Sequence, residues 1–559
     1  MASVPSGTVV TLTATVKSMA IAVTVGQVSF CDAAAKACTD INLLGTGQLT
    51  SAGAAVMKFV PGIGKHSYKA IFAGTPHGVK EYSGSISRKA PLSVTGKFAT
   101  ATSISETGSA GDYTLTATVM GLVNAATAAA PAGKVSFVDT TDANHVLAKA
   151  ELGAGPLALN FVQSAAPGTN PYPQYVSVAD FTGDGHLDLA VPVYSIFTPQ
   201  ADANVFLGNG DGTFTAAAAF PVSGQNANNF AVGDFDGDGK PDLAISLPDA
   251  DQVQVLLGNG DGSFTAMTPI SVNAVFLVAT GDFNGDGNAD LAVVSPGATA
   301  VYILLGNGAG TFTTGATVSV AEPTAITVAD FNGDGIADLA VVNGGTYMVT
   351  IFLGNGDGTF TAVASTPSTG VEPLSITAGD FNGDGIADLA VSNQNYGYPN
   401  PGTVTVLLGK GDGTFTTAPT LQSGSIPYTV AVADFNGDGK ADLVTGNAGG
   451  NDASIFLGNG DGTFAAPLSP PLGNNPIGTG VGDFNGDGLP DLAAGNNTAY
   501  TVTVMLTAET QTATAVATGV APKGSGQHAV EASYKGNAKY AGSVSSTVTL
   551  TGNEALDKK

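Results

Sequence analysis

This chain of 559 residues contains little of what several protein classes need. It has no tryptophan, two cysteines and a single arginine, Arg88. No run of 18 apolar residues occurs, which argues against a membrane-spanning helix. The formal net charge is −26 at pH 7, whereas nucleic acids and anionic membrane surfaces are bound by basic clusters. We therefore expect neither a nucleic-acid partner nor membrane insertion.

The sequence also lacks recognisable catalytic motifs. It shows no His-Glu zinc motif, no G-x-S-x-G turn and no phosphate-binding loop. Its histidines are scattered at positions 66, 77, 145, 186 and 528. A lone histidine of this kind is usually a surface or strand residue. We therefore do not expect an enzyme, although two carboxylates from different repeats could still meet in a central channel.

The two cysteines, Cys31 and Cys38, flank a short segment between two strand-like stretches. This spacing favours a hairpin disulfide, which forms in oxidising compartments; two free thiols are the alternative. The first residues, MASVPSG, do not resemble a signal peptide. We expect a secreted or cell-surface protein whose export signal is absent from this chain.

Seven copies of a nine-residue acidic loop run through the middle of the chain. Their starts are separated by 54, 48, 48, 50, 54 and 49 residues, and they hold 22 of the 45 acidic residues. A fixed period of this length indicates a repeated supersecondary unit. The copies read DFTGDGHLD from Asp180, DFDGDGKPD from Asp234, DFNGDGNAD from Asp282, DFNGDGIAD from Asp330 and Asp380, DFNGDGKAD from Asp434 and DFNGDGLPD from Asp483.

The residue types in these loops predict a divalent-cation site. Side chains at positions 1, 3 and 5 can direct oxygens to one point, position 7 would offer its carbonyl, and Asp at position 9 would close the site. Hard oxygen ligands with several carboxylates favour Ca²⁺. We expect up to seven Ca²⁺ ions, one per loop, that stiffen the fold. The expected ligands, loop by loop, are Asp180, Thr182, Asp184, His186 and Asp188; Asp234, Asp236, Asp238, Lys240 and Asp242; Asp282, Asn284, Asp286, Asn288 and Asp290; Asp330, Asn332, Asp334, Ile336 and Asp338; Asp380, Asn382, Asp384, Ile386 and Asp388; Asp434, Asn436, Asp438, Lys440 and Asp442; and Asp483, Asn485, Asp487, Leu489 and Asp491.

Each repeat predicts four short antiparallel strands, with the acidic loop between the first and the second. A turn of the type NGDG follows the third strand, as expected for a hairpin. Seven such units predict a seven-bladed β-propeller over residues 157–508. The seventh unit lacks the NGDG turn, and we expect residues 159–167 to supply its missing strand and close the ring.

The flanking segments read as β-sandwich domains. Residues 1–96 and 97–156 share strand-like motifs, and the second match resumes only after the seventh loop, over 509–552. This order predicts an all-β protein in which the propeller is inserted into the second of two Ig-like sandwiches. The expected parts are sandwich one (1–96), the first part of sandwich two (97–156), the propeller (157–508), the second part of sandwich two (509–552) and a tail (553–559). Two unrelated β-segments flanking the propeller are the alternative.

The loops resemble the FG-GAP/VCBS repeats of integrin α-subunit propellers and of many bacterial surface proteins. The flanks resemble bacterial Ig-like repeats more weakly. The resemblance implies Ca²⁺ on the bottom face of the propeller and ligands on its top face. The first loop departs from the pattern, because Thr182 replaces Asn at position 3, which predicts a weaker site.

Two long top-face loops carry aromatic side chains suited to sugar or peptide recognition. The candidate ligand residues are Tyr194 and Phe197 in one loop and Tyr396 and Tyr398 in the other. These features predict a calcium-stabilised binding or adhesion module for an extracellular glycan or protein. A structural subunit of an extracellular filament or surface layer, which could self-associate through its Ig-like domains, is an alternative. A polysaccharide-active lyase or hydrolase is another.

Overall fold

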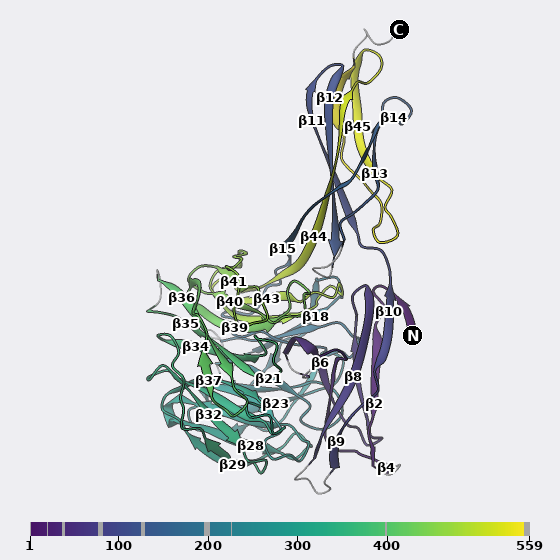
Figure 1. Cartoon of the computed structure of the whole chain (residues 1–559). Coiled ribbons are helices and arrows are strands. Elements are labelled where there is room, and N and C mark those ends of the chain that lie inside the picture. Colours follow the sequence, from purple (N-terminus) through teal and green to yellow (C-terminus); the bar gives the residue numbers. More distant parts are fainter. Residues whose placement is uncertain are drawn as a thin grey trace.

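The computed structural model describes residues 2–18, 21–35, 38, 40–75, 82–123, 129–194, 202–224, 226–396 and 400–552. These residues form β-strands, with two single-turn 3-10 helices, η1 (Asp40–Asn42) and η2 (Pro296–Ala298). The predicted all-β class is confirmed. No described segment forms a helix of the length and hydropathy needed to cross a membrane. Figure 1 shows a ring of sheets, a sandwich beside it and an arm that projects from its rim.

The ring consists of successive small antiparallel sheets, and seven of them lie within the described part of residues 177–506. The first strands of neighbouring sheets contact one another all the way round, and the last of them, β42, contacts the first, β16. We number the sheets as blades one to seven in chain order. The first three strands of blades one to seven are β16 (Ser177–Ala179), β17 (Asp188–Pro192) and β18 (Asp202–Gly208); β21 (Phe230–Gly233), β22 (Asp242–Leu247) and β23 (Gln252–Gly258); β26 (Leu277–Gly281), β27 (Asp290–Ser295) and β28 (Ala300–Gly306); β30 (Pro323–Ala329), β31 (Asp338–Asn343) and β32 (Met348–Gly354); β34 (Pro373–Gly379), β35 (Asp388–Asn393) and β36 (Pro401–Gly409); β39 (Pro427–Ala433), β40 (Asp442–Asn447) and β41 (Asp452–Phe456); and β42 (Pro476–Gly482), β43 (Asp491–Asn496) and β44 (Thr501–Val520).

The outer edge of the blades is less regular than the inner strands. In the described part of blade six it is reduced to isolated bridges, Asp452 with Pro471, Ile455 with Leu468 and Gly458 with Phe464. The second strands of all blades are fully buried, because both of their faces are covered by neighbouring blades. The outer strands of blades one to five are β19 (Phe214–Ala216) and β20 (Phe220–Pro221); β24 (Phe264–Ala266) and β25 (Ile270–Ser271); β29 (Phe312–Ser319); β33 (Phe360–Ala362); and β37 (Phe415–Thr417) and β38 (Leu421–Ser425).

The ring is closed by a strand that precedes the first blade. Strand β15 (Gly153–Ala165) pairs with β44 of blade seven, with Leu159 opposite Glu509 and Val162 opposite Leu506. It therefore takes the place of the outer strand that blade seven lacks. Closure of this kind covers the edge that β44 would otherwise expose.

A Phe–Phe contact joins each acidic loop to the next blade, all the way round the closed ring. The Phe at position 2 of each acidic loop meets an outer-strand Phe of the next blade, with ring centroids 5.5 to 6.1 Å apart. For the sixth loop the partner of Phe435 is Phe161, which comes from β15. The last pair, Phe484 with Phe214, returns to blade one. The segment before the first blade thus supplies the contact that completes the series.

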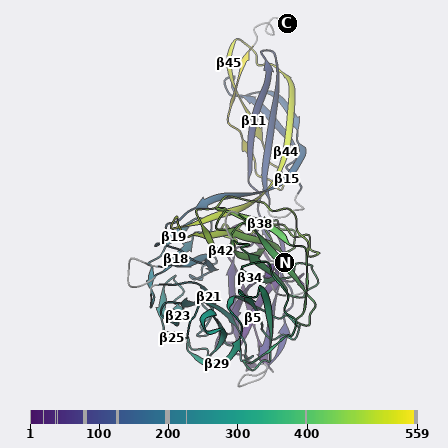
Figure 2. The ribbon, with the colours of Figure 1, turned by 90° about the vertical axis from the view of Figure 1, so that its left-hand side faces the viewer.

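The arm is a sandwich made by both flanking segments. One sheet contains β11 (Thr100–Ser109), β12 (Asp112–Val123) and the outer part of β44, and β15 begins on it. The second sheet contains β13 (Lys134–Asp139), β14 (His145–Glu151), β45 (Gly526–Tyr534), β46 (Ser543–Val544) and β47 (Val548–Gly552). Its core includes Leu115, Phe137 and Ala532. Because β44 runs from blade seven into this core, arm and ring share one continuous sheet (Figure 2).

A second sandwich, formed by the N-terminal residues, packs around a core that includes Val28, Phe30 and Phe72. Cys31 and Cys38 form a disulfide with Cα atoms 5.6 Å apart. The strands of the larger sheet are β1 (Ala2–Pro5), β5 (Gln27–Asp32), β6 (Leu43–Gln48), β8 (Gly64–Thr75), β9 (Tyr82–Ile86) and β10 (Ala90–Thr95), and the other strands are β2 (Val10–Thr15), β3 (Lys17–Ser18), β4 (Ile21–Ala22) and β7 (Ala54–Phe59).

The N-terminal sandwich docks on the face of the ring that carries the acidic loops. Lys58 Nζ donates to the Gly183 carbonyl of loop one at 2.5 Å, and Gln48 Nε2 donates to the Gly287 carbonyl of loop three at 2.6 Å. The η1 turn contacts the inner strands β34 and β39, and Ile41 packs against the core of blades five and six. We call this side of the ring the loop face.

Two glycines at position 6 of their loops offer a matched test of this docking. Gly287 of loop three has φ +85° and Gly335 of loop four has φ +84°, so an Ala strains the backbone equally at both. An added Cβ would lie 2.5 Å from the Gly26 Cα at Gly287, whereas it meets nothing within 4 Å at Gly335. We expect Gly287→Ala to lower the free energy of unfolding by roughly 1–3 kcal/mol more than Gly335→Ala. Calorimetry of both variants measures the difference, and equal losses would contradict the docking.

Candidate functional site: acidic loops and an opposite pocket

Each acidic loop joins the first strand of its blade to the second. Glycines at positions 4 and 6 adopt positive φ, for example 78° at Gly333 and 84° at Gly335. Glycine accepts this conformation without the Cβ clash of other residues. The backbone therefore coils tightly between positions 3 and 7, which brings the acidic side chains together.

The aspartate at position 9 has a role that the loop pattern alone did not predict. In every blade this residue is fully buried. Its Oδ2 accepts the backbone N–H of the position-2 Phe at 2.7–2.9 Å. Its Oδ1 accepts a backbone N–H from the third strand or its C-terminal end at 2.7–2.8 Å; in blade seven the donor is Thr507, within β44. This carboxylate therefore ties the loop to the blade in addition to its expected place as a cation ligand.

The side chains at positions 1, 3 and 5 lie along the inside of the loop. In loop four, Asp330 Oδ2 accepts the Gly335 N–H at 2.8 Å, and Asp334 Oδ1 accepts the Ile336 N–H at 2.8 Å. In loop two, carboxylate oxygens of Asp234, Asp236 and Asp242 all lie within 4.8 Å of one another. In loop two the structure thus brings together three of the five residues that the sequence spacing assigned to one site.

Two loops depart from the common arrangement. In loop one the Thr182 hydroxyl donates to Asp180 Oδ1 at 3.2 Å, as a donor rather than a free ligand oxygen. In loops two and six a Lys at position 7 forms an ion pair with the Asp at position 5, with Lys240 and Lys440 Nζ at 2.5 and 3.3 Å from their carboxylates. Both ammonium groups are partly exposed, so they can leave these carboxylates at little cost.

Burial makes these loops electrostatically unfavourable without a counter-charge. Burial first, and then neighbouring loop carboxylates, raise the pKa of Asp242 and Asp290 to about 7 despite their backbone hydrogen bonds. In loop three, Asp282 Oδ1 is buried and has no hydrogen-bond partner among the described atoms. Clustered carboxylates that include a buried oxygen without a hydrogen bond are suited to binding a cation. The repeated buried aspartates could therefore hold a metal ion.

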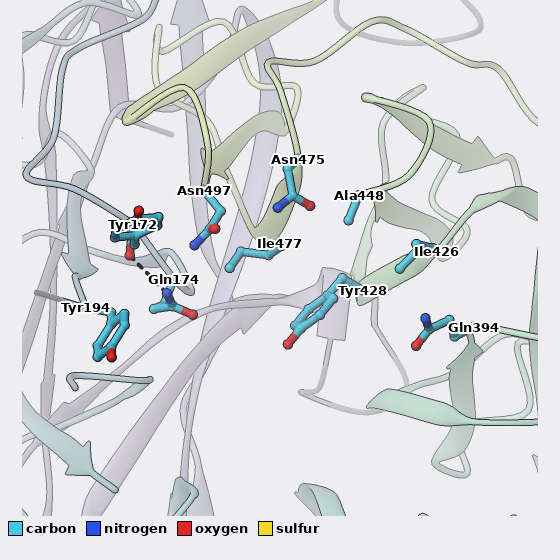
Figure 3. A pocket seen from close by; sticks show the side chains of 10 residues that line it. All are labelled: Tyr172, Gln174, Tyr194, Gln394, Ile426, Tyr428, Ala448, Asn475, Ile477 and Asn497. Carbon is cyan, nitrogen blue, oxygen red and sulfur yellow. Dashed lines mark hydrogen bonds between the residues drawn. The ribbon is translucent and has the colours of Figure 1, made fainter. Parts of the chain in front are cut away.

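A pocket lies at the other end of the strands. Its lining residues come just before or within the first strands or just after the second strands, whereas the acidic loops leave the opposite ends. We call this side the pocket face. The cavity has a volume of about 600 Å³ and is lined by Tyr172, Gln174, Tyr194, Gln394, Ile426, Tyr428, Ala448, Asn475, Ile477 and Asn497 (Figure 3).

Phenols and carboxamides give this pocket its chemistry. Tyr172 packs beside Tyr194 with ring centroids 6.1 Å apart, and Gln174 Nε2 donates to the Tyr172 carbonyl at 2.9 Å. Burial raises the pKa of Tyr428, whose phenol is neutral at physiological pH even at its ordinary pKa of about 10. No charged side chain is found among the described lining residues. The pocket therefore offers neutral hydrogen-bonding groups and aromatic faces.

The sequence-based ligand candidates are only partly gathered here. Tyr194 lines the pocket, whereas Tyr396 does not and is 69% exposed. Phe197 and Tyr398 lie outside the described residues. Tyr172 and Tyr428 were missed, because they stand next to the first strands rather than in the long loops. Their place before or at the start of a first strand was the available signal.

The sequence matches the FG-GAP-like repeat model in six overlapping segments, at residues 193–245, 234–293, 282–341, 330–391, 396–445 and 434–494. Together these segments cover more than half of the chain. The chain therefore belongs to the FG-GAP-like repeat family, which confirms the resemblance that the acidic loops indicated.

Solved structures with similar folds include a protein from Lactobacillus plantarum, with TM-score 0.45 and 14% identity over 62% of this chain and 98% of that chain. Another is the periplasmic gluconolactonase of Pseudomonas aeruginosa, with TM-score 0.44 and 15% identity over 62% of this chain and 97% of that chain. A third is the Dos1 propeller, with TM-score 0.37 and 11% identity over 60% of this chain and 81% of that chain. These low scores carry no argument about function. No curated protein matches the sequence.

The raised pKa values predict how the metal-free protein responds to pH. The unfolded chain releases its aspartate protons near pH 4, whereas folded Asp188, Asp388 and Asp442 release theirs at about pH 7. Between these values the folded state holds more protons, so the free energy of unfolding falls as pH rises. We expect the melting temperature in metal-free buffer to fall from pH 5 to pH 8. Calorimetry in chelator-treated buffers measures this, and a melting temperature that rises over this range would contradict it.

Proposed function

We propose that this protein is an extracellular binding module, stabilised by Ca²⁺ on the loop face, whose ligand occupies the pocket face. The observation that carries this proposal is the uncharged pocket of about 600 Å³ at the ends of the strands opposite the acidic loops. Concave sites with aromatic walls and a few convergent polar groups are typical of ligand binding. The FG-GAP propeller fold is consistent with such a role.

The chemistry of the pocket favours an uncharged glycan as the ligand. Tyrosine rings can cover the apolar faces of a sugar, and carboxamides such as Asn475 and Asn497 can bond its hydroxyl groups. A protein segment rich in neutral polar side chains is the second ligand class that this lining would accept.

Binding is favoured over glycoside hydrolysis by the absence of carboxyl groups from the described pocket lining. Hydrolysis of a glycosidic bond ordinarily needs a pair of carboxyl groups across the scissile bond. The described lining supplies phenols, carboxamides and aliphatic side chains. The pocket is thus better suited to holding a sugar than to hydrolysing it.

Ca²⁺ is the cation that the loops suit best. Hard carboxylate and carboxamide oxygens on a glycine-rich coil favour Ca²⁺ over softer metals, and the flexible coil favours it over Mg²⁺. Secretion or display at the cell surface, where Ca²⁺ is abundant, would also suit the Cys31–Cys38 disulfide.

Self-association through the sandwiches, as in a filament, is a second proposal, which light scattering with and without Ca²⁺ can test.

Removal of Ca²⁺ should destabilise the propeller. Each bound ion would neutralise several buried carboxylates, so binding to the folded state adds stability according to ligand concentration and affinity. At pH 7.4 we expect the melting temperature to fall by 10 °C or more when 2 mM Ca²⁺ is replaced by excess chelator, and to recover when Ca²⁺ is restored. Calorimetry measures this, with Mg²⁺ as the comparison ion. An unchanged melting curve would rule out the stabilising role.

Substitutions in the pocket should reduce ligand binding without unfolding the ring. We expect Tyr172→Ala and Asn475→Ala each to weaken binding at least tenfold to neutral glycans identified on a glycan array, because each removes a wall or a hydrogen bond. Met348→Ala is the matched control, since Met348 is 37% exposed at the start of β32 and does not line the pocket. Unaltered binding by both pocket variants, with normal melting curves, would move the ligand site elsewhere.

A further inference from the structure

The junction of the ring and the arm differs from every other blade boundary. In blades one to six the third strand ends in a turn. In blade six, the backbone N–H of Gly462 in this turn donates to the Phe381 carbonyl of loop five, in the preceding blade, at 2.9 Å. The same bond recurs between the turns of blades one to five and the loops that precede them. Blade seven has no such turn, because β44 continues into the arm. The sixth loop therefore faces a continuous strand in place of a turn.

Glu509 occupies the position where the turn would begin. The bond from Thr507 N–H to Asp491 Oδ1 is equivalent to the bond from Gly458 N–H to Asp442 Oδ1 in blade six. Two residues further on, blade six has Gly460 and blade seven has Glu509. Here the chain carries a long carboxylate side chain in place of a glycine.

This carboxylate is buried and lacks a partner. Glu509 is 2% exposed, and its Oε2 has no hydrogen-bond partner among the described atoms. Its strand runs between β15 and β12, where Leu159 and Val123 are its paired residues. A carboxyl group in such surroundings either stays protonated or needs a compensating positive charge. The ammonium group of Lys440, in loop six, forms its ion pair with Asp438.

Glu509 lies beside the residues of β15 that pack on the sixth acidic loop, since Leu159 is its paired residue. Burial first, and then the carboxylates of Asp434 and Asp438 of that loop, raise the pKa of Glu509. The packing agrees with this, since Leu159 and Phe161 of β15 pack against the core that contains Phe435 of the same loop. Like charges gathered at a buried place disfavour one another unless a cation lies between them.

We propose that Glu509 completes the sixth acidic loop as a cation site shared between blade six and the strand that carries the arm. The cation is Ca²⁺, and Glu509 supplies a carboxylate ligand from outside the nine-residue loop. This assignment rests on the proposed role of Ca²⁺ in the loops, and it makes the sixth site an inter-blade bridge. Glu509 pairs with Val123 of the arm strand β12, so the bridge lies where arm and ring meet.

The test uses the full chain and compares Glu509→Gln with the wild type. Gln keeps the shape of Glu but removes its charge. We expect Glu509→Gln to melt at the same or a higher temperature than wild type in metal-free buffer, and to gain less from Ca²⁺. Equilibrium dialysis at limiting free Ca²⁺ should show one bound ion fewer per chain, from a loss of at least tenfold in affinity at one site. Glu106→Gln, on the exposed surface of β11, is the matched control.

The variant Asp434→Asn, alone and combined with Glu509→Gln, tests whether Glu509 acts at the sixth loop. If Glu509 acts through this site, Glu509→Gln causes no further loss of the Ca²⁺ response in the Asp434→Asn background. Additive losses would contradict the shared site. If Glu509→Gln does not fold, Glu509→Asp retains the charge with a shorter reach, and the proposal then requires a weakened Ca²⁺ response from that variant.

The outcomes separate the two proposals. A wild-type protein that ignores Ca²⁺ would overturn the calcium role and this site with it. A wild type that responds to Ca²⁺ beside a Glu509→Gln variant with the same response and the same number of bound ions would overturn the shared site alone. Glu509 would then be a buried neutral acid of purely structural importance.

Discussion

The buried aspartate that ends each acidic loop is the constraint on which the ring depends. One carboxylate holds the backbone of the loop through its second residue and the end of the third strand of the same blade. Hydrogen bonds to a charged acceptor are stronger than neutral ones, yet burial makes the charge itself costly. The same residue therefore fixes the loop and favours a cation beside it. Blade geometry and the capacity of the loops to hold a metal ion are two consequences of one buried carboxylate.

Closure of the ring transmits this constraint to the rest of the chain. Strand β44 belongs to blade seven at one end and to the arm at the other, and β15 accompanies it across the junction. Blade seven and the arm are thus joined by a continuous ladder of backbone hydrogen bonds. The N-terminal sandwich is attached differently, through side chains such as Lys58 and Gln48 that reach the backbone of individual loops.

The sequence was informative where the chain repeats and uninformative where parts meet. The loops predicted the all-β class and the FG-GAP family, and the missing turn predicted that residues 159–167 close the ring, which the pairing of β15 with β44 confirms. Docking of the N-terminal sandwich was not predictable, because Val9, Thr50 and Val60 form no motif and approach loops one, two and seven only in the folded chain. Tyr428 was missed for a related reason, since the pocket is assembled from separate blades.

The two faces of the ring differ in charge, which the overall composition does not reveal. Negative charge is concentrated on the loop face, where the N-terminal sandwich covers part of it, while the described pocket lining on the other face carries no charge. Cations bound by the loops would alter a local field whose strength falls within about 8 Å in physiological salt. Any influence of such cations on the pocket would therefore pass through the rigidity of the blades. A ring stiffened on one face can hold pocket-lining side chains from several blades in register on the other.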